Sequence, residues 1–307
     1  MKVLIATSKP FAIEAVRGIK EIIDNAGFEL SVLEKYADKS QLLDAVKDAD
    51  ALIVRSDPVD SAVMEAAGNL KIVVRAGAGY DNINLDIATA RNIVVMNTPG
   101  QNAAAVAELA LGLMLIAGRN FYDGSMGIEM FHKTLGLHGF GNVARRLASL
   151  VRGCAMDIYA YDPYYPAEDF KKIQGVIAAQ SLEELYENCQ YVSVHIPATD
   201  ETKNIINYDL LKRMPHNAIL VNTARKEVVD EAGLVKWMEE RPDVKYLTDV
   251  ATSNDTELRA KFTNRYFSTP KKMGAQTVEA NNNAGIAAAN QIVDFLLNGN
   301  TKFQVNG

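Results

Sequence analysis

A glycine-rich loop in the middle of the chain has residue types whose backbone can bind a phosphate group. The loop Gly139-Phe-Gly-Asn-Val-Ala144 has the spacing G-x-G-x-x-A and follows the apolar run Thr134–His138. Gly139 permits a tight turn, Gly141 lets the backbone approach a pyrophosphate, and the small Ala144 allows a helix to pack closely on the strand. The helix N-terminus adds amides and a favourable dipole for the same anion. We therefore predict a dinucleotide-binding loop here.

An acidic residue follows at the place where such a loop needs one. The next predicted strand, Met156–Tyr161, ends directly before Asp162, which stands 18 positions after Ala144. A carboxylate there can bind both hydroxyls of a ribose and repels a 2′-phosphate, which favours NAD over NADP. The alternative is a glycine turn in an unrelated α/β unit. The combination of strand, loop, helix and acid favours an NAD site.

Three arginines directly follow apolar runs or come close behind them, and they suit a small anionic substrate. Arg225 comes after the run Ile219–Asn222, where α/β folds place their ligands. A planar guanidinium binds a carboxylate through two parallel hydrogen bonds, which gives orientation as well as charge. Arg55 and Arg75 each end a run nearer the N-terminus, and we expect them to hold a substrate phosphate. The alternatives are a surface salt bridge for Arg225 and structural ion pairs for the other two.

The composition is that of a globular protein with a sizeable core and an acidic surface. The chain has 307 residues, 48% of them hydrophobic, and a net charge of −6, which argues against a nucleic-acid partner. Its longest apolar stretch, Ala103–Ala117, is interrupted by Glu108 and is too short for a membrane span. Cys154 and Cys189 have neither metal-ligand nor redox spacing, which is typical of reduced thiols in a cytoplasmic protein. The histidines form no metal-ligand pattern either, so we expect no metal.

Short apolar runs alternate with helical stretches along the chain. Because these runs are apolar throughout, they suit parallel strands that are covered by helices on both faces, which makes the fold class α/β. The runs are Val3–Ala6, Ala51–Val54, Ile72–Val74, Ile93–Met96, Leu135–His138, Ile158–Tyr161, Val192–His195 and Ile219–Asn222.

The position of the glycine loop predicts a split domain. More than 130 residues of α/β sequence precede the loop, so another domain must come first. The long helix Asn102–Ala117 is suited to cross into the second domain, and the last helix, about Glu279–Leu297, is suited to return to the first. We predict a discontinuous substrate-binding domain, 1–97 plus 279–307, and an NAD-binding domain, 98–278, with the active site in the cleft between them.

Several stretches together resemble the D-2-hydroxyacid dehydrogenases, nearly from end to end. They are Val54–Ser56, Arg75–Asn82, Asn97–Gly100, Ala105–Leu109, the glycine loop, Tyr161–Pro163, Val194–Pro197 and Val221–Arg225. Within that family the sequence is most similar to short 3-phosphoglycerate dehydrogenases. The resemblance implies two doubly wound parallel-sheet domains, one a Rossmann NAD-binding domain and one flavodoxin-like. It also implies a homodimer joined through the cofactor domains and, since the sequence stops at Gly307, no regulatory C-terminal domain.

The resemblance also implies roles for individual residues. Arg225 would bind the substrate carboxylate and polarise the keto oxygen, while the amides of Ala78 and Gly79 would bind the same carboxylate unless this is a simple glycine turn. The residues expected to bind NAD are Gly139, Phe140, Gly141, Asn142, Val143, Asp162, His195, Pro197, Thr202, Thr223, Ala224 and Asp249. The residues expected to bind the substrate are Arg55, Ser56, Arg75, Ala78, Gly79 and Asn102.

The sequence departs from the family at the proton-transfer residues. Most members have a histidine directly after Thr-Pro near the C-terminus, but here Thr269-Pro270 is followed by Lys271 and Lys272. The glutamate that usually pairs with the histidine is replaced by Asn254, with Asp255 and Glu257 only nearby. A lysine is cationic at neutral pH, so it can act as the acid without a carboxylate partner. Lys271 is the replacement if the alignment is anchored on Thr-Pro, and Lys272 if it is anchored on Gly274-Ala-Gln-Thr277.

The predicted function is oxidation of D-3-phosphoglycerate to 3-phosphohydroxypyruvate with NAD, the first step of phosphorylated serine biosynthesis. Arg225 and one of the two lysines are the expected catalytic residues. A hydroxypyruvate or glyoxylate reductase of the same family is the alternative enzyme. A non-catalytic NAD-sensing protein is the alternative of another class, and the absence of the histidine and glutamate is what favours it.

A lysine base gives a distinctive pH dependence. Because the ordinary lysine pKa is near 10.4, the neutral amine that accepts a proton becomes more abundant as the pH rises. We expect the rate of NADH formation from 3-phosphoglycerate to increase steadily from about pH 7 into the alkaline range. A maximum close to pH 7, as for a histidine base, would contradict the lysine hypothesis.

Overall fold

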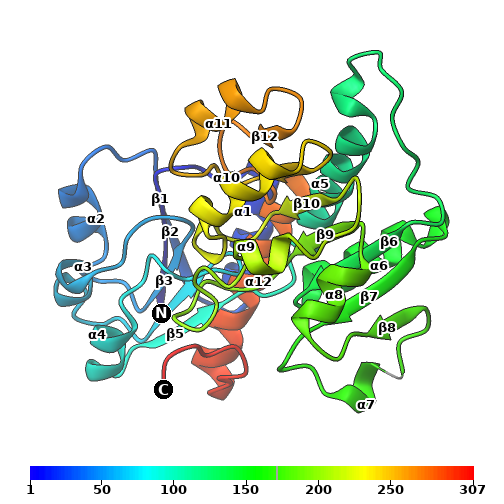
Figure 1. Ribbon diagram of the computed structural model, residues 1–307. Coiled ribbons are helices and arrows are strands. Elements are labelled where there is room, and N and C mark those ends of the chain that lie inside the picture. Colours follow the sequence, from blue (N-terminus) through cyan, green and yellow to red (C-terminus); the bar gives the residue numbers. More distant parts are fainter. Residues whose placement is uncertain (171) are drawn as a thin grey trace. The chain divides into compact units, whose positions relative to one another are not determined.

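The chain divides into two compact units in the computed structural model, which describes residues 1–170 and 172–307 (Figure 1). Unit 1 comprises residues 1–102 and 276–307, and unit 2 comprises residues 103–275. Both termini therefore belong to unit 1. The predicted boundaries were 97/98 and 278/279, so the observed divisions fall a few residues inside the predicted NAD-binding domain at both ends.

Unit 1 is built on a five-stranded parallel sheet with the order β2-β1-β3-β4-β5. This order is that of flavodoxin-like folds, as predicted. The strands are β1 (Lys2–Thr7), β2 (Glu29–Glu34), β3 (Ala51–Val54), β4 (Ile72–Arg75) and β5 (Val94–Asn97). The sequence did not predict β2, because this edge strand is half-exposed and carries a glutamate at each end.

Helices cover both faces of this sheet. They are α1 (Ile13–Asn25), α2 (Lys39–Ala45), α3 (Ser61–Ala66), α4 (Leu85–Ala90) and α12 (Val278–Asn298). Residues of α1 and α12 share one apolar cluster with the sheet, and residues of α2 to α4 share the other. Gly18 of α1 and Gly285 of α12 allow close approach, since an added Cβ would lie 2.4 Å from Ile286 and 3.0 Å from Ile19, respectively. The helix predicted at about Glu279–Leu297 corresponds to α12, which belongs to unit 1.

Unit 2 contains a seven-stranded parallel sheet with the order β12-β11-β10-β9-β6-β7-β8. The strand order reverses beside β6, which is the arrangement of a Rossmann domain. The strands are β6 (Thr134–His138), β7 (Asp157–Tyr161), β8 (Val176–Ala178), β9 (Tyr191–Val194), β10 (Ile219–Asn222), β11 (Lys245–Thr248) and β12 (Tyr266–Ser268). The short strands β8, β11 and β12 were not predicted.

The helices of unit 2 also form two layers. α5 (Ala103–Gly118), α6 (Asn142–Val151) and α7 (Ala167–Phe170) contribute to one apolar cluster. α8 (Leu182–Asn188), α9 (Tyr208–Leu211), α10 (Glu231–Glu240) and α11 (Asp255–Lys261) contribute to the other. Three short 3-10 turns complete the unit, namely η1 (Asn120–Tyr122), η2 (Arg152–Cys154) and η3 (Lys226–Val228). Among the described residues, no helix is long and apolar enough to cross a membrane.

Gly136 in the middle of β6 packs closely against α8 and the residue that follows it. An added Cβ would lie 3.1 Å from Cys189 and 3.2 Å from Leu185, both of which are fully buried. We expect Gly136→Val to lower the free energy of unfolding by about 1–3 kcal/mol through overpacking. Thermal and urea unfolding measure this loss.

Gly112 on α5 provides the matched control. An added Cβ there meets no atom within 4 Å, so Gly112→Ala should raise the stability by up to about 1 kcal/mol through helix propensity. Equal stability of the two variants would contradict the packing described for β6 and α8.

Candidate active site

The glycine loop begins at a position that only glycine can occupy without strain. Gly139 has a φ of 89°, in the left-handed region, and an added Cβ would lie 2.8 Å from the carbonyl oxygen of His195. Its amide donates to the carbonyl oxygen of Tyr161 at 2.8 Å. The loop is therefore tied to the end of β7 on one side and touches the chain after β9 on the other.

The helix that follows has an open N-terminus. Gly141 is the N-cap of α6 and has no side chain that could cap the helix. It is exposed, and an added Cβ meets no atom within 4 Å. Asn142 and Val143 form the first turn, while Ala144 is fully buried against the sheet. First-turn amides and the helix dipole at such an end favour an anion. This geometry fits the pyrophosphate of the predicted cofactor.

Asp162 is held against the glycine loop by backbone amides. One carboxylate oxygen accepts from the amide of Phe140 at 2.8 Å, and the other from the amide of Tyr164 at 2.9 Å. The Phe140 ring is 1% exposed and packs against Tyr165 and Phe170, so Phe140 offers its backbone rather than its side chain to this region. The predicted ribose-binding acid is thus placed directly beside the predicted pyrophosphate loop.

Two buried polar atoms lie near the carboxyl ends of the next strands. In the part of the chain that the structure describes, Nε2 of His195 and Oγ1 of Thr223 are buried and have no hydrogen-bond partner. They follow β9 and β10, on the side of β6 away from β7. Orphaned polar atoms of this kind are costly unless a ligand satisfies them. They therefore fit the second half of a dinucleotide.

The two histidines near the loop are neutral. Burial lowers the pKa of His138 to about 4 and that of His195 to about 3. His138 Nδ1 lies 3.1 Å from the hydroxyl of Tyr186, and its side chain is 3% exposed. These contacts make His138 a structural residue at the end of β6.

The turn after β9 is closed by a threonine. The Thr202 hydroxyl donates to the carbonyl oxygen of Pro197 at 2.6 Å and accepts from the amide of Thr199 at 2.8 Å. The predicted cofactor residues Pro197 and Thr202 are therefore brought together, with Thr202 shaping the turn.

The loop after β10 is organised by an asparagine that the sequence did not single out. Asn222 is fully buried, accepts from the amide of Ala224 at 2.9 Å and donates to the carbonyl oxygen of Arg225 at 2.9 Å. The feature of the sequence that could have identified Asn222 is its position at the carboxyl end of a central strand, where α/β folds place their sites. Asn222 thereby sets the direction in which Arg225 leaves the sheet.

The segment that carries the two lysines is organised by Asp249. This carboxylate is 1% exposed and accepts from the Thr269 hydroxyl at 2.9 Å, the Met273 amide at 2.7 Å and the Gly274 amide at 2.8 Å. An added Cβ on Gly274 would lie 2.9 Å from the same carboxylate. In this structure both oxygens of Asp249 hold the lysine segment, and its predicted contact with the cofactor stays a prediction.

Lys272 and Arg225 meet at one carbonyl oxygen. The Lys272 ammonium donates to the carbonyl oxygen of Ala224 at 3.2 Å, and the Arg225 guanidinium donates to the same atom at 3.0 Å. Both lysines are exposed, but the Lys271 contact is made by its backbone, whose carbonyl oxygen accepts from the Thr269 hydroxyl at 2.9 Å. Of the two open alignments, this geometry favours the one that assigns Lys272.

Comparison with known proteins gives the family. The family described as "D-isomer specific 2-hydroxyacid dehydrogenase, NAD binding domain" matches residues 106–271. The solved NAD+-bound 3-phosphoglycerate dehydrogenase of Entamoeba histolytica is 46% identical, with a TM-score of 0.91 over 100% of this chain and 99% of that one. This chain belongs to the D-isomer specific 2-hydroxyacid dehydrogenase family. Unit 2 contains its NAD-binding domain.

Curated relatives in this family carry more than one activity name. A D-3-phosphoglycerate dehydrogenase of Methanocaldococcus jannaschii is 35% identical over 84% of this chain and 52% of the relative. A hydroxypyruvate reductase of Thermotoga maritima is 34% identical over 86% of this chain and 90% of the relative. The chain therefore spans about half the length of the first relative but most of the second.

The carboxylate near the usual family glutamate is engaged elsewhere. Asp255 accepts from the Tyr266 hydroxyl at 2.6 Å and from Arg259 at 2.8 Å, and it also accepts from Ser268. These bonds tie α11 to β12. Asn254 precedes α11, and its side-chain oxygen is buried without a partner among the described residues. Asp255 thus acts as an anchor for α11.

The predicted anion-binding residues of unit 1 differ in how they are engaged. Arg55 donates to the carbonyl oxygens of Lys9 at 2.9 Å and Pro10 at 2.8 Å, and it also bonds Asn281. Burial lowers its pKa. These contacts favour the structural alternative for Arg55. Ser56 is exposed, and Asn102 is half-buried at the last position of the unit's first segment.

The glycine turn of unit 1 has features of an anion site. Gly77 has a φ of 147°, and an added Cβ would lie 1.3 Å from the Arg75 guanidinium, so the arginine folds over the turn. Within residues 1–170 and 172–307, the amides of Ala78 and Gly79 donate no hydrogen bond. Two adjacent amides without acceptors suit a carboxylate.

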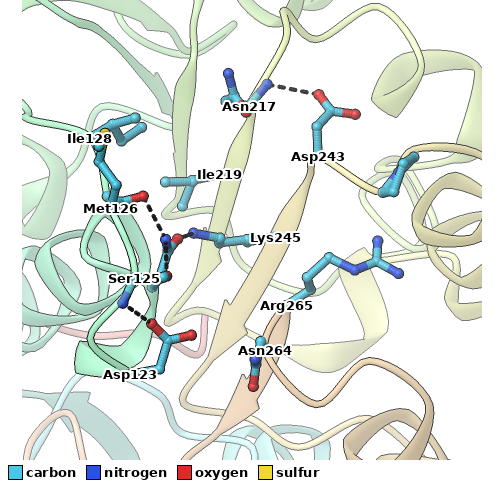
Figure 2. Close-up of a pocket in the computed structure, with 13 residues that line it drawn as sticks. Asp123, Ser125, Met126, Ile128, Asn217, Ile219, Asp243, Lys245, Asn264 and Arg265 are labelled. Atoms are coloured by element: carbon cyan, nitrogen blue, oxygen red, sulfur yellow. Dashed lines mark hydrogen bonds between the residues drawn. The ribbon is translucent and has the colours of Figure 1, made fainter.

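The cavity shown in Figure 2 is separate from the predicted site residues. It has a volume of about 380 Å³ and lies in unit 2, where Asn217, Lys245 and Arg265 stand at or just before the amino ends of strands. Its two cations already bind helix-terminal carbonyl groups. Lys245 donates to Ala117 at the end of α5, and Arg265 donates to Met238 and Arg241 at the end of α10. The two cations therefore stabilise the ends of α5 and α10.

The two lysines can be told apart by substitution. We expect Lys272→Ala to reduce kcat by roughly 100- to 10,000-fold, the usual contribution of general acid–base catalysis. Lys271→Ala, the matched control in the neighbouring position, should leave kcat within about threefold of the wild type. Steady-state kinetics on both variants measure this difference. The reverse order would assign Lys271, and full activity of both variants would exclude a lysine acid/base.

Proposed function

We propose that the protein oxidises D-3-phosphoglycerate to 3-phosphohydroxypyruvate with NAD, as the first step of phosphorylated serine biosynthesis. The observation that supports this most is the meeting of Arg225 and Lys272 at the Ala224 carbonyl oxygen, in a family whose members act on 2-hydroxy acids. The Entamoeba histolytica protein of known structure, named a 3-phosphoglycerate dehydrogenase, supports the choice of substrate.

The residues of unit 2 divide the chemistry between them. When bound, NAD supplies the acceptor for the hydride that leaves C2 of the substrate. Gly139, Gly141 and the first turn of α6 would hold its pyrophosphate, and Asp162 its ribose. His195 and Thr223 would satisfy their buried polar atoms on its other half.

Arg225 and Lys272 would act on the substrate itself. The guanidinium binds the carboxylate and stabilises the negative charge that develops on the C2 oxygen. The Lys272 amine takes the proton of the C2 hydroxyl in the oxidation and returns it in the reduction. The amides of Ala78 and Gly79 are donors of the kind that a substrate carboxylate needs.

We also propose a cytoplasmic homodimer joined through unit 2. Three large apolar side chains are exposed on the connector between α5 and β6, namely Tyr122 at 68%, Met126 at 95% and Phe131 at 53%. Exposed apolar groups gathered on one segment favour a protein partner. Light scattering at micromolar concentration distinguishes a dimer from a monomer.

A hydroxypyruvate or glyoxylate reductase is a second candidate. It is supported by the contacts of Arg55, which bind carbonyl and amide oxygens of unit 1. The Thermotoga maritima relative named hydroxypyruvate reductase, matched over 90% of its length, supports the same alternative.

Substrate preference decides between the two enzymes. If a cation binds the phosphate, kcat/KM for 3-phosphoglycerate should exceed that for D-glycerate by roughly 10- to 100-fold. This ratio corresponds to the free energy of about one charge-assisted hydrogen bond. Arg55→Ala and Arg75→Ala, assayed side by side, identify which arginine supplies it through loss of the preference.

Equal kcat/KM for the two acids would favour the reductase. Binding of NADH without turnover of any 2-hydroxy or 2-keto acid would favour the third alternative, an NAD-sensing protein without catalysis.

A further inference from the structure

A tyrosine–glutamate hydrogen bond connects the two chain segments that flank the glycine loop. The hydroxyl of Tyr164, which follows β7, donates to a carboxylate oxygen of Glu201, which follows β9, at 2.8 Å. In the sheet, β6 lies between β7 and β9 (Figure 1). Because neighbouring strands are about 4.8 Å apart, β7 and β9 are separated by two strand spacings. The bond between their following segments therefore spans the end of β6, the strand that carries the glycine loop.

The backbone around Tyr164 directs its side chain away from the core. The Tyr164 amide donates to Asp162 at 2.9 Å, which fixes the chain on one side. On the other side, the Tyr165 ring packs against the rings of Phe140 and Phe170, with centroid distances of 5.3 Å and 4.6 Å, respectively. The Tyr164 side chain itself is 79% exposed. An exposed side chain on so constrained a backbone is available to a ligand at this edge.

Glu201 is held on an ordered turn. Its neighbour Thr202 closes the turn through bonds to Pro197 and Thr199 at 2.6 and 2.8 Å. The carboxylate is therefore presented from a defined backbone position, two residues beyond Thr199. The Tyr164 bond joins this turn to the segment that carries Asp162.

Two carboxylates act on the Tyr164 phenol. The hydrogen bond to Glu201 and, more weakly, the charge of Asp162 hold the pKa of this phenol above its ordinary value. The phenol therefore stays protonated and remains a donor at neutral pH. Asp162 and Glu201 together give this side of the glycine loop two negative charges.

We propose that Tyr164 and Glu201 form a clasp beside the adenosine half of bound NAD, and that Glu201 is a second acid, with Asp162, that rejects a 2′-phosphate. The adenosine half is assigned to this side because Asp162 is the group suited to the ribose hydroxyls. The proposal depends on NAD binding at the glycine loop and not on the identity of the substrate.

Removal of the Tyr164 hydroxyl tests the clasp. We expect Tyr164→Phe to increase the NADH dissociation rate by about three- to tenfold, the value of one hydrogen bond, measured by stopped-flow fluorescence. The affinity for ADP-ribose should fall by a similar factor, while that for nicotinamide mononucleotide should not change. Tyr208→Phe is the matched control, because it removes a bond from Tyr208 to Glu240 that joins α9 to α10. Thermal unfolding confirms that each variant is folded.

Removal of the Glu201 charge tests the second acid. Glu201→Gln keeps a hydrogen-bond acceptor, so we expect NADH affinity to change less than in Tyr164→Phe. NADPH affinity relative to NADH should rise by about tenfold, and this gain should shrink at high salt. Dissociation rates and nucleotide affinities equal to wild type in both variants would overturn the proposal, as would the absence of NADH binding by the wild-type protein. These nucleotide-binding measurements contain no substrate. Their outcomes therefore do not depend on whether the protein oxidises 3-phosphoglycerate.

Discussion

The parallel pairing that continues one residue past the end of β6 is the constraint on which unit 2 depends. On one side the Gly139 amide bonds the carbonyl oxygen of Tyr161, and on the other the His195 amide bonds that of His138, both at 2.8 Å. These two bonds bring the ends of β7, β6 and β9 to one edge. The glycine loop, Asp162 and His195 then have to lie together, because parallel strands end on the same side of a sheet.

Buried side chains extend this edge toward the proposed catalytic residues. Asn222 holds the loop that carries Arg225, and Asp249 holds the segment that carries Lys272. Each binds backbone groups of the loop it holds, and the Gly274 amide is buried, so leaving that amide without a partner would cost about 1–3 kcal/mol. The long cationic side chains are therefore positioned by short, buried ones. In the proposed site, short buried polar groups thus set the direction of the longer cationic side chains.

The sequence predicted the parts of the fold that bury continuous apolar surface and missed the parts that do not. Central strands such as β6 and β9 are recognisable from their apolar runs. The edge strand β2 carries a glutamate at each end, and β12 is only three residues long, so neither has a distinct pattern. The glycine loop was predictable for a different reason. A positive φ and a close backbone approach at Gly139 leave few residue types that fit.

The choice between Lys271 and Lys272 shows what spacing along the chain cannot supply. Counting from Thr-Pro and counting from Gly274 give different answers, because one of the two stretches has gained a residue. In the structure, Asp249, a side chain more than 20 positions earlier, binds the amides of Met273 and Gly274. With those amides turned toward Asp249, the Lys272 ammonium reaches the Ala224 carbonyl oxygen beside Arg225. A buried carboxylate that serves the backbone thus selects which of two adjacent cations faces the arginine.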